Sequence, residues 1–114
     1  MGLEGLRRGD IVTVAGAGYG SKPRPAVIIQ SDLFPTTPSL TVCLFTSSAL
    51  DLSVSRVDIA PDEVNNLRAP SALMIDKIVT FRRDQVGRRV GRLSDNDVGR
   101  LNRALLVFLG LAGE

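Results

Sequence analysis

The side chains that could carry out chemistry in this chain are few in kind. Its 114 residues include no histidine and a single cysteine, Cys43. Histidine is the usual general acid or base near neutral pH and the commonest metal ligand, so zinc centres of the ordinary Cys/His kinds are excluded. One cysteine also excludes an internal disulfide. Hydrolytic chemistry, if present, must therefore use carboxylates, hydroxyls, Tyr19, lysine or arginine.

Arginine dominates the cationic residues. The 14 basic residues are 12 arginines and two lysines, and the net charge is +2. A guanidinium donates two parallel hydrogen bonds to phosphate and stays protonated, although GC-rich coding is the commoner cause of such an excess. Five of the arginines fall within residues 82–92. This basic segment either binds phosphates or an acidic partner, or forms a solvated turn.

The elements that would position these side chains are mostly strands. Alternating or continuous apolar runs predict strands at 10–14, 25–30, 41–46, 56–59 and 71–81. The last run is long and charged only at its middle, so we expect it to be extended or kinked near a site. Cys43 is expected to pack as a small core hydrophobe. Ser94, with Asp97 three residues later, predicts the start of a helix that ends at Gly110.

This order of elements predicts one mainly β domain over residues 1–114, an antiparallel barrel-like sheet with a C-terminal helix packed against it. The apolar stripe of the helix is expected to lie in the core or in a dimer interface. The N-terminus lacks the apolar core of a secretory signal, and the longest apolar stretch is about half of what crosses a bilayer. We therefore expect a cytoplasmic protein.

Four short motifs follow one another along the chain: Arg8-Gly9-Asp10-Ile11-Val12, Lys22 to Asp32 (KPRPAVIIQSD), Phe45-Thr46-Ser47, and 69–78 (APSALMIDKI). With them the chain resembles, over nearly its whole length, the MazF/PemK/Kid toxins of type II toxin–antitoxin systems. The resemblance implies a five-stranded SH3-like, CcdB/MazF-like barrel, a homodimer, and sequence-specific cleavage of single-stranded RNA without metal or cofactor. It also implies an antitoxin partner whose acidic, disordered tail lies across the RNA groove.

The resemblance assigns the two catalytic positions. Arg24, between two prolines, matches the family's catalytic arginine, and Thr46 matches its catalytic threonine. In the cleavage, the ribose 2′-hydroxyl attacks the phosphate, leaving a 2′,3′-cyclic phosphate and a 5′-hydroxyl. The charge that develops on the phosphorane oxygens requires donors already in place. Arg24 is expected to stabilise this charge, and because a guanidinium rarely gives up its proton, its role as the proton carrier stays open.

The same matching implies a set of RNA-binding residues: Tyr19, Lys22, Pro25, Ser47, Arg56, Ser71 and Lys77. Two of them depart from the family. Tyr19 stands where many relatives have a glutamate, and is expected either to stack on a base or to cover one end of the barrel. Lys77 stands where relatives often have a glutamine, which exchanges base recognition for attraction to phosphate.

Two other functions suit this architecture. CcdB-like toxins inhibit DNA gyrase without cleaving anything, but they carry a tryptophan in their C-terminal end, and this chain has no tryptophan. A degenerate relative could persist as an antitoxin-binding module, but the presence of both Arg24 and Thr46 argues against this. The sequence therefore favours an endoribonuclease toxin.

Overall fold

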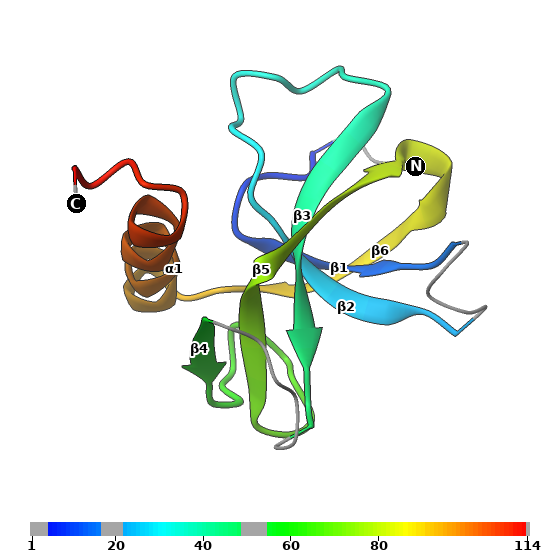
Figure 1. The fold of residues 1–114 in the computed structure, drawn as a ribbon. Coiled ribbons are helices and arrows are strands. Elements are labelled where there is room, and N and C mark those ends of the chain that lie inside the picture. The colour runs from blue at the N-terminus through cyan, green and yellow to red at the C-terminus, as the bar shows by residue number, and fades with distance from the viewer. Residues whose placement is uncertain (1–4, 17–21, 49–54, 114) are drawn as a thin grey trace.

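A computed structural model describes residues 5–16, 22–48 and 55–113. Its strands form one antiparallel sheet in the order β4-β5-β3-β2-β1-β6, and a helix follows (Figure 1). The elements are β1 (Asp10–Val14), β2 (Arg24–Ile28), β3 (Ser39–Thr46), β4 (Arg56–Ile59), β5 (Ser71–Arg82), a 3-10 turn (Arg83–Gln85), β6 (Val86–Arg92) and α1 (Asp95–Phe108). The expected mainly β fold with a C-terminal helix is confirmed.

The central strands are apolar on both faces because the sheet separates two apolar clusters. Neighbouring residues of a strand point to opposite faces, so Cys43 joins one cluster and Leu44 the other. The helix-side cluster contains Ile11, Val27, Cys43, Phe45, Val57, Ile59, Leu73, Ile75, Leu93, Leu101 and Leu105. The second cluster contains Val12, Val14, Ala26, Ile28, Leu40, Val42, Leu44, Met74, Phe81 and Val86.

Strand β5 bends in its middle, as Figure 1 shows. Its first residues pair with β4 and with the end of β3, where Ala72 lies opposite Thr46. Its last residues pair with the beginning of β3, where Arg82 lies opposite Ser39. Between these stretches the register shifts, so that residues 74–77 lie opposite a single residue of β3. The strand was expected to be long or kinked, and with 12 residues and a register shift it is both.

The sheet has one strand more than expected, and the basic segment supplies it. Residues 86–92 pair with β1 as β6, so a solvated turn is wrong for this stretch, and only Arg83–Gln85 form a turn. The buried positions of β6 are Val86 and Gly91. A glycine does not count as apolar in an alternating pattern, and the register of β6 against β1 is irregular. For both reasons the sequence pattern does not reveal β6 as a strand.

The sheet is open, because its edge strands β4 and β6 do not pair with each other in the described residues. Loop 60–67 lies along β6 instead, and the Arg92 backbone N–H donates to the Val64 carbonyl at 3.0 Å. The side chain of Asn65 is fully buried and donates to the Ala60 carbonyl at 2.9 Å, which holds the loop in shape. A loop thus covers one edge of the expected barrel.

Helix α1 begins as predicted, because the Ser94 hydroxyl accepts a hydrogen bond from the Asp97 backbone N–H at 3.1 Å. Leu101 and Leu105 are buried in the helix-side cluster. The C-terminal end of the helix is different, since a group of large apolar side chains there is 42–68% exposed: Leu106, Val107, Phe108, Leu109 and Leu111. No helix in the described part of the chain is long and apolar enough to span a membrane.

The contact between β6 and loop 60–67 can be tested at Gly91. A Cβ atom there would lie 2.5 Å from the Asn65 carbonyl oxygen and 2.7 Å from that of Val64. Gly91→Ala should therefore lower the free energy of unfolding by about 1–3 kcal/mol, measured by urea denaturation. The matched control is Gly99→Ala in α1, whose Cβ meets nothing closer than 3.6 Å. This change should raise stability by up to about 1 kcal/mol. Equal effects would contradict the packing described.

Candidate active site

Strands β2 and β3 bring Arg24 and Thr46 into one row of the sheet. The strands pair with Ala26 opposite Leu44. The pairing of these two strands ends there. If the same antiparallel register is continued by two residues, Arg24 at the start of β2 comes level with Thr46 at the end of β3. Because side chains alternate, both point to the face that carries the second cluster. Arg24 is exposed and Thr46 is half-buried.

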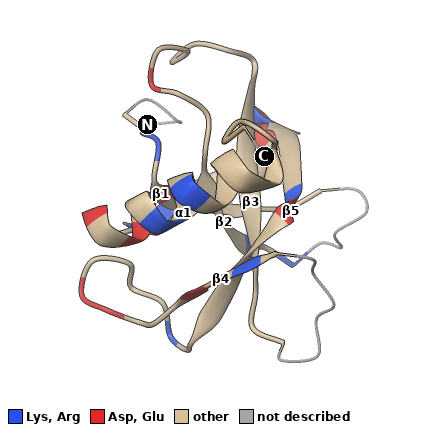
Figure 2. Ribbon diagram, turned by 60° about the vertical axis from the view of Figure 1, so that its left-hand side comes forward, with Lys and Arg blue, Asp and Glu red and all other residues tan. Residues whose placement is uncertain are grey.

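The row continues across the sheet to β4. Thr46 is paired with Ala72 of β5, and Ala72 is paired with Asp58 of β4. Asp58 therefore faces the same side as Thr46, and Arg56, two residues earlier, shares that side. Figure 2 shows basic and acidic positions next to each other on β4. The sheet thus brings together polar side chains from three separate strands: Arg24, Thr46, Asp58 and Arg56.

A surface pocket of about 400 Å³ lies at the β4 end of this row. We call it the β4 pocket, and its lining residues are Thr46, Ser47, Arg56, Asp58, Ile59, Ala60, Pro70 and Ser71. Four of them, Thr46, Ser47, Arg56 and Ser71, were expected to contact RNA or to act in catalysis. The tertiary structure therefore brings part of the predicted set into one hollow.

The hydroxyls of Thr46 and Ser71 differ in the hydrogen bonds that they can still make to a ligand. Oγ1 of Thr46 accepts from the Ser48 backbone N–H at 3.1 Å, so its own proton remains available for donation. Oγ of Ser71 instead donates to the Ala69 carbonyl at 3.1 Å. Its proton is thereby used, and the oxygen retains only acceptor capacity.

Asp58 is a member of the site that the sequence analysis did not select. Its backbone carbonyl accepts a hydrogen bond from Nη1 of Arg100 at 2.8 Å, and the same Nη1 lies 2.9 Å from the Asp97 carboxylate. The first turns of α1 thus fix the position of β4. The signal was present, because alternation along residues 56–59 places Asp58 on the same face as Arg56.

The remaining expected RNA-binding residues lie elsewhere. Lys22 is exposed just before β2, and Lys77 is exposed at the bend of β5. Pro25 is paired with Thr13, and alternation turns it to the face of the sheet opposite the row. The last of the set, Tyr19, lies outside the described residues.

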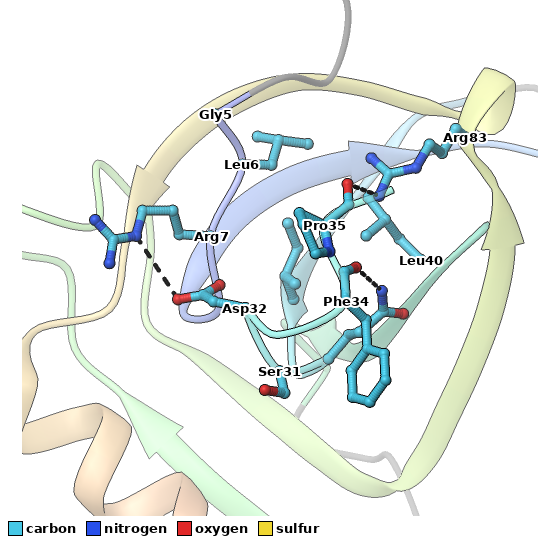
Figure 3. A pocket seen from close by; sticks show the side chains of 11 residues that line it. Gly5, Leu6, Arg7, Ser31, Asp32, Phe34, Pro35, Leu40 and Arg83 are labelled. Carbon is cyan, nitrogen blue, oxygen red and sulfur yellow. Dashed lines mark hydrogen bonds and ion pairs between the residues drawn. The ribbon is translucent and has the colours of Figure 1, made fainter. Parts of the chain in front are cut away.

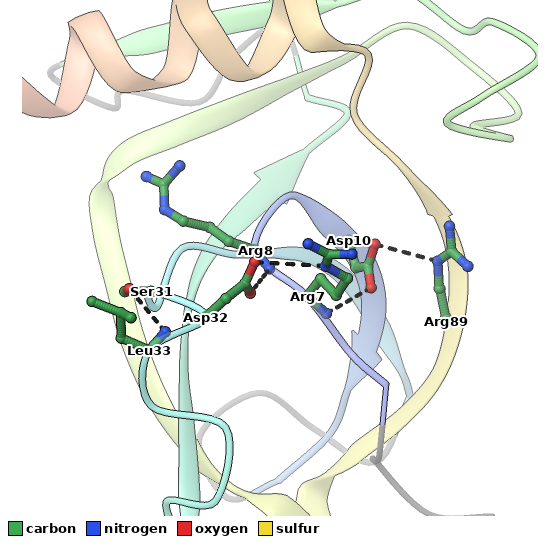
Figure 4. Close-up of polar contacts among 7 residues, drawn as sticks. All are labelled: Arg7, Arg8, Asp10, Ser31, Asp32, Leu33 and Arg89. Atoms are coloured by element: carbon green, nitrogen blue, oxygen red, sulfur yellow. Dashed lines mark hydrogen bonds and ion pairs between the residues drawn. The ribbon is translucent and has the colours of Figure 1, made fainter.

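The Asp10 carboxylate ties the basic segment to the start of β1 (Figure 4). Asp10 is only 3% exposed, accepts from the Arg7 backbone N–H at 2.8 Å, and lies 3.3 Å from Nε of Arg89 on β6. A buried carboxylate requires such partners. Arg89 is therefore engaged within the fold. On the neighbouring loop, Asp32 accepts from the Arg8 backbone N–H at 2.7 Å.

Another pocket, of about 320 Å³, lies where the loop after β2 meets the N-terminal segment (Figure 3). Phe34, Pro35 and Leu40 line it, together with Arg83 of the basic segment. The guanidinium of Arg83 donates to the Pro35 carbonyl at 2.9 Å and also to that of Thr37. Of the expected catalytic and RNA-binding residues that the structure describes, none lines this pocket.

Comparison with known proteins identifies the family to which the chain belongs. Residues 7–109 match the model of the PemK-like, MazF-like toxins of type II toxin–antitoxin systems. A relative from Mycolicibacterium smegmatis, named "Probable endoribonuclease MazF", is 50% identical over 109 residues, which cover 95% of this chain and 100% of that protein.

Solved structures with a similar fold include two toxin–antitoxin complexes. A mycobacterial endoribonuclease in complex with its cognate antitoxin superposes with a TM-score of 0.76 at 22% identity, covering 93% of this chain and 96% of that one. The MazE–MazF structure from Deinococcus radiodurans gives a TM-score of 0.73 at 16% identity, covering 92% and 96%. At these identities the likeness concerns the fold.

The chain's one thiol is not part of the site. Cys43 is fully buried in the helix-side cluster, and its Sγ donates to the Met74 carbonyl at 3.2 Å. Burial, and secondly the nearby charge of Asp76, raise the pKa of this thiol from 9.0 to about 12. The expected core role of Cys43 is confirmed, and its thiol stays protonated at neutral pH.

This thiol should not react while the protein is folded. We expect no modification of Cys43 by a maleimide in native protein near neutral pH, and complete modification in concentrated guanidinium chloride, because thiolate attacks the reagent. Rapid labelling of the native protein would contradict the packing around Cys43.

The raised pKa of Cys43 also contributes to the free energy of unfolding. This contribution is present below pH 9.0 and is lost as the pH rises toward about 12.

Proposed function

Because the chain belongs to the PemK-like, MazF-like toxin family of type II toxin–antitoxin systems, we propose that it is a toxin that acts as an endoribonuclease. The observation that carries the proposal is the row formed by Arg24 and Thr46, which ends in the β4 pocket beside Arg56. The endoribonuclease name of the 50% identical relative supports RNA as the substrate. The name of this relative does not favour the alternative function, inhibition of DNA gyrase.

The proposed mechanism uses donors in place of histidine. The 2′-oxygen of RNA attacks the adjacent phosphorus as its hydroxyl loses a proton, and the bond to the 5′-oxygen breaks. The 5′-oxygen takes up one proton, so that a 2′,3′-cyclic phosphate and a 5′-hydroxyl remain. Negative charge on the non-bridging oxygens meets the Arg24 guanidinium and the Thr46 hydroxyl, whose proton is available because its oxygen accepts from Ser48. Arg24 contributes by stabilising this charge, because a guanidinium holds its proton at neutral pH.

Neighbouring residues would hold the single strand on both sides of the cut. In the β4 pocket, Arg56 supplies a positive charge, and Ser47 and Ser71 supply polar contacts. The family resemblance also supports substrate contacts by Lys22 and Lys77, which do not line the pocket, and by Tyr19, which lies outside the described residues.

The proposed partners are a second copy of the chain and an antitoxin with an acidic segment. Two similar structures are of toxins bound to antitoxins, and Arg24 and Arg56 would attract acidic side chains that compete with RNA. The exposed apolar residues at the end of α1 and just after it, within 106–111, support self-association, because such patches commonly mark interfaces. An RNA substrate places the proposed activity in the cytoplasm.

Cleavage should be independent of metal and dependent on Arg24. We expect purified protein to cut single-stranded RNA in excess EDTA, leaving 2′,3′-cyclic phosphate ends. Arg24→Ala should lower the rate by at least about 100-fold, since one missing donor costs this much. Arg103→Ala, at an exposed arginine of α1, is the matched control and should keep full activity. Intact RNA across a diverse pool would refute the enzyme, and a strict need for a divalent ion would refute the mechanism.

The salt dependence of binding should locate the RNA. If phosphates lie in the β4 pocket, Arg56→Gln should reduce the slope of log affinity against log salt concentration by about 0.7, the value for one contact to a single strand. Arg88→Gln, at an exposed position of β6, should leave the slope unchanged. The measurement is fluorescence anisotropy with an uncleavable 2′-deoxy oligonucleotide. The reverse pattern would place the RNA along the basic segment.

A further inference from the structure

The β4 pocket contains a carboxylate that is unsuited to binding phosphate. Asp58 lines the pocket together with Arg56 and Thr46, and it is exposed. Its link to Arg100 is made through the backbone carbonyl, which leaves the carboxylate oxygens available to a ligand. A negative charge in a groove for a polyanion repels phosphate. A ligand group with N–H donors at that position would turn this repulsion into attraction.

The lining of the pocket includes hydrogen-bond acceptors. The Asp58 carboxylate has only acceptor capacity, and the Ser71 oxygen is limited to accepting because its proton is already donated to a backbone carbonyl. Apolar surface for a flat ring lies in the same lining, at Pro70. The donors of the pocket are on other residues, Arg56 and Thr46. The two kinds of group suit a nucleobase on one side and its phosphate on the other.

The bases of RNA differ in what they offer to a carboxylate. In single-stranded RNA the Watson–Crick edge is accessible to protein side chains. Guanine presents two neighbouring donors there, N1–H and the N2 amino group, which match the two oxygens of a carboxylate. On cytosine and adenine a ring nitrogen acceptor lies next to the amino group, and on uracil carbonyl oxygens flank the single N3–H. Each of these other edges repels one carboxylate oxygen.

We propose that the β4 pocket binds a guanine of the RNA substrate, with the Asp58 carboxylate accepting from N1–H and N2–H. This assignment rests on the proposed endoribonuclease function, for which it supplies a specificity-determining contact. Asp58 takes no part in the bond-breaking step. The backbone of Asp58 is held by Arg100 of α1, whose Nη1 lies 2.8 Å from the Asp58 carbonyl oxygen.

The test compares guanosine with inosine, which differs only by lacking the N2 amino group. Cleavage sites of the wild-type protein are first mapped on a random RNA pool, and we expect guanine to be required at one position near the cut. In a short RNA carrying that site, replacing this guanosine by inosine should lower kcat/KM by about tenfold. Asp58→Ala should lower kcat/KM for the guanosine RNA similarly and bring the two substrates within about twofold of each other.

The controls separate this proposal from its premise. Glu63→Ala removes an exposed carboxylate that does not line the β4 pocket, and should preserve the guanosine preference. If the wild-type protein cleaves no RNA, the proposed function fails. If it cleaves RNA without requiring guanine, or if Asp58→Ala changes all substrates equally, the function stands and the role of Asp58 is overturned.

Discussion

The bend in β5 is the constraint on which the rest of the structure depends. One strand of 12 residues pairs with β4 and the end of β3 through its first part, and with the beginning of β3 through its last part. Residues 74–77 absorb the change of register opposite a single residue of β3. Extra residues in one strand bend the strand and increase its twist. The sheet can therefore curve and carry apolar clusters on both faces.

The same arrangement produces the candidate active site at the edge of the sheet. Strand β4 pairs with the first part of β5 and is an edge strand, and the β4 pocket forms beside it. The helix stabilises this edge through one guanidinium, since Arg100 joins Asp97 of α1 to the backbone of Asp58. Because the Ser94 hydroxyl caps the same turn through the Asp97 N–H, the start of the helix and the wall of the pocket are physically connected.

Several parts of the fold were predictable because their signals are local. The strand at 56–59 and the helix cap at Ser94 follow from alternation and from hydrogen bonding within one turn. Strand β6 was missed because its burial depends on a glycine and on pairing with β1, which lies more than 70 residues earlier. Asp58 was missed for a related reason, since its neighbours in the pocket, Thr46 and Ser71, come from other strands.

The sequence by itself determined the class of chemistry, because a chain without histidine and with one cysteine depends mainly on arginine, hydroxyls and carboxylates. It also determined the family, through motifs that are contiguous in the chain. Only the tertiary structure decided which of these groups share a site. Strand register, continued to the strand ends, brings Arg24 level with Thr46. It places Asp58 beyond Ala72 and turns Pro25 to the other face. Register is set by pairing between distant segments, so no single segment contains it.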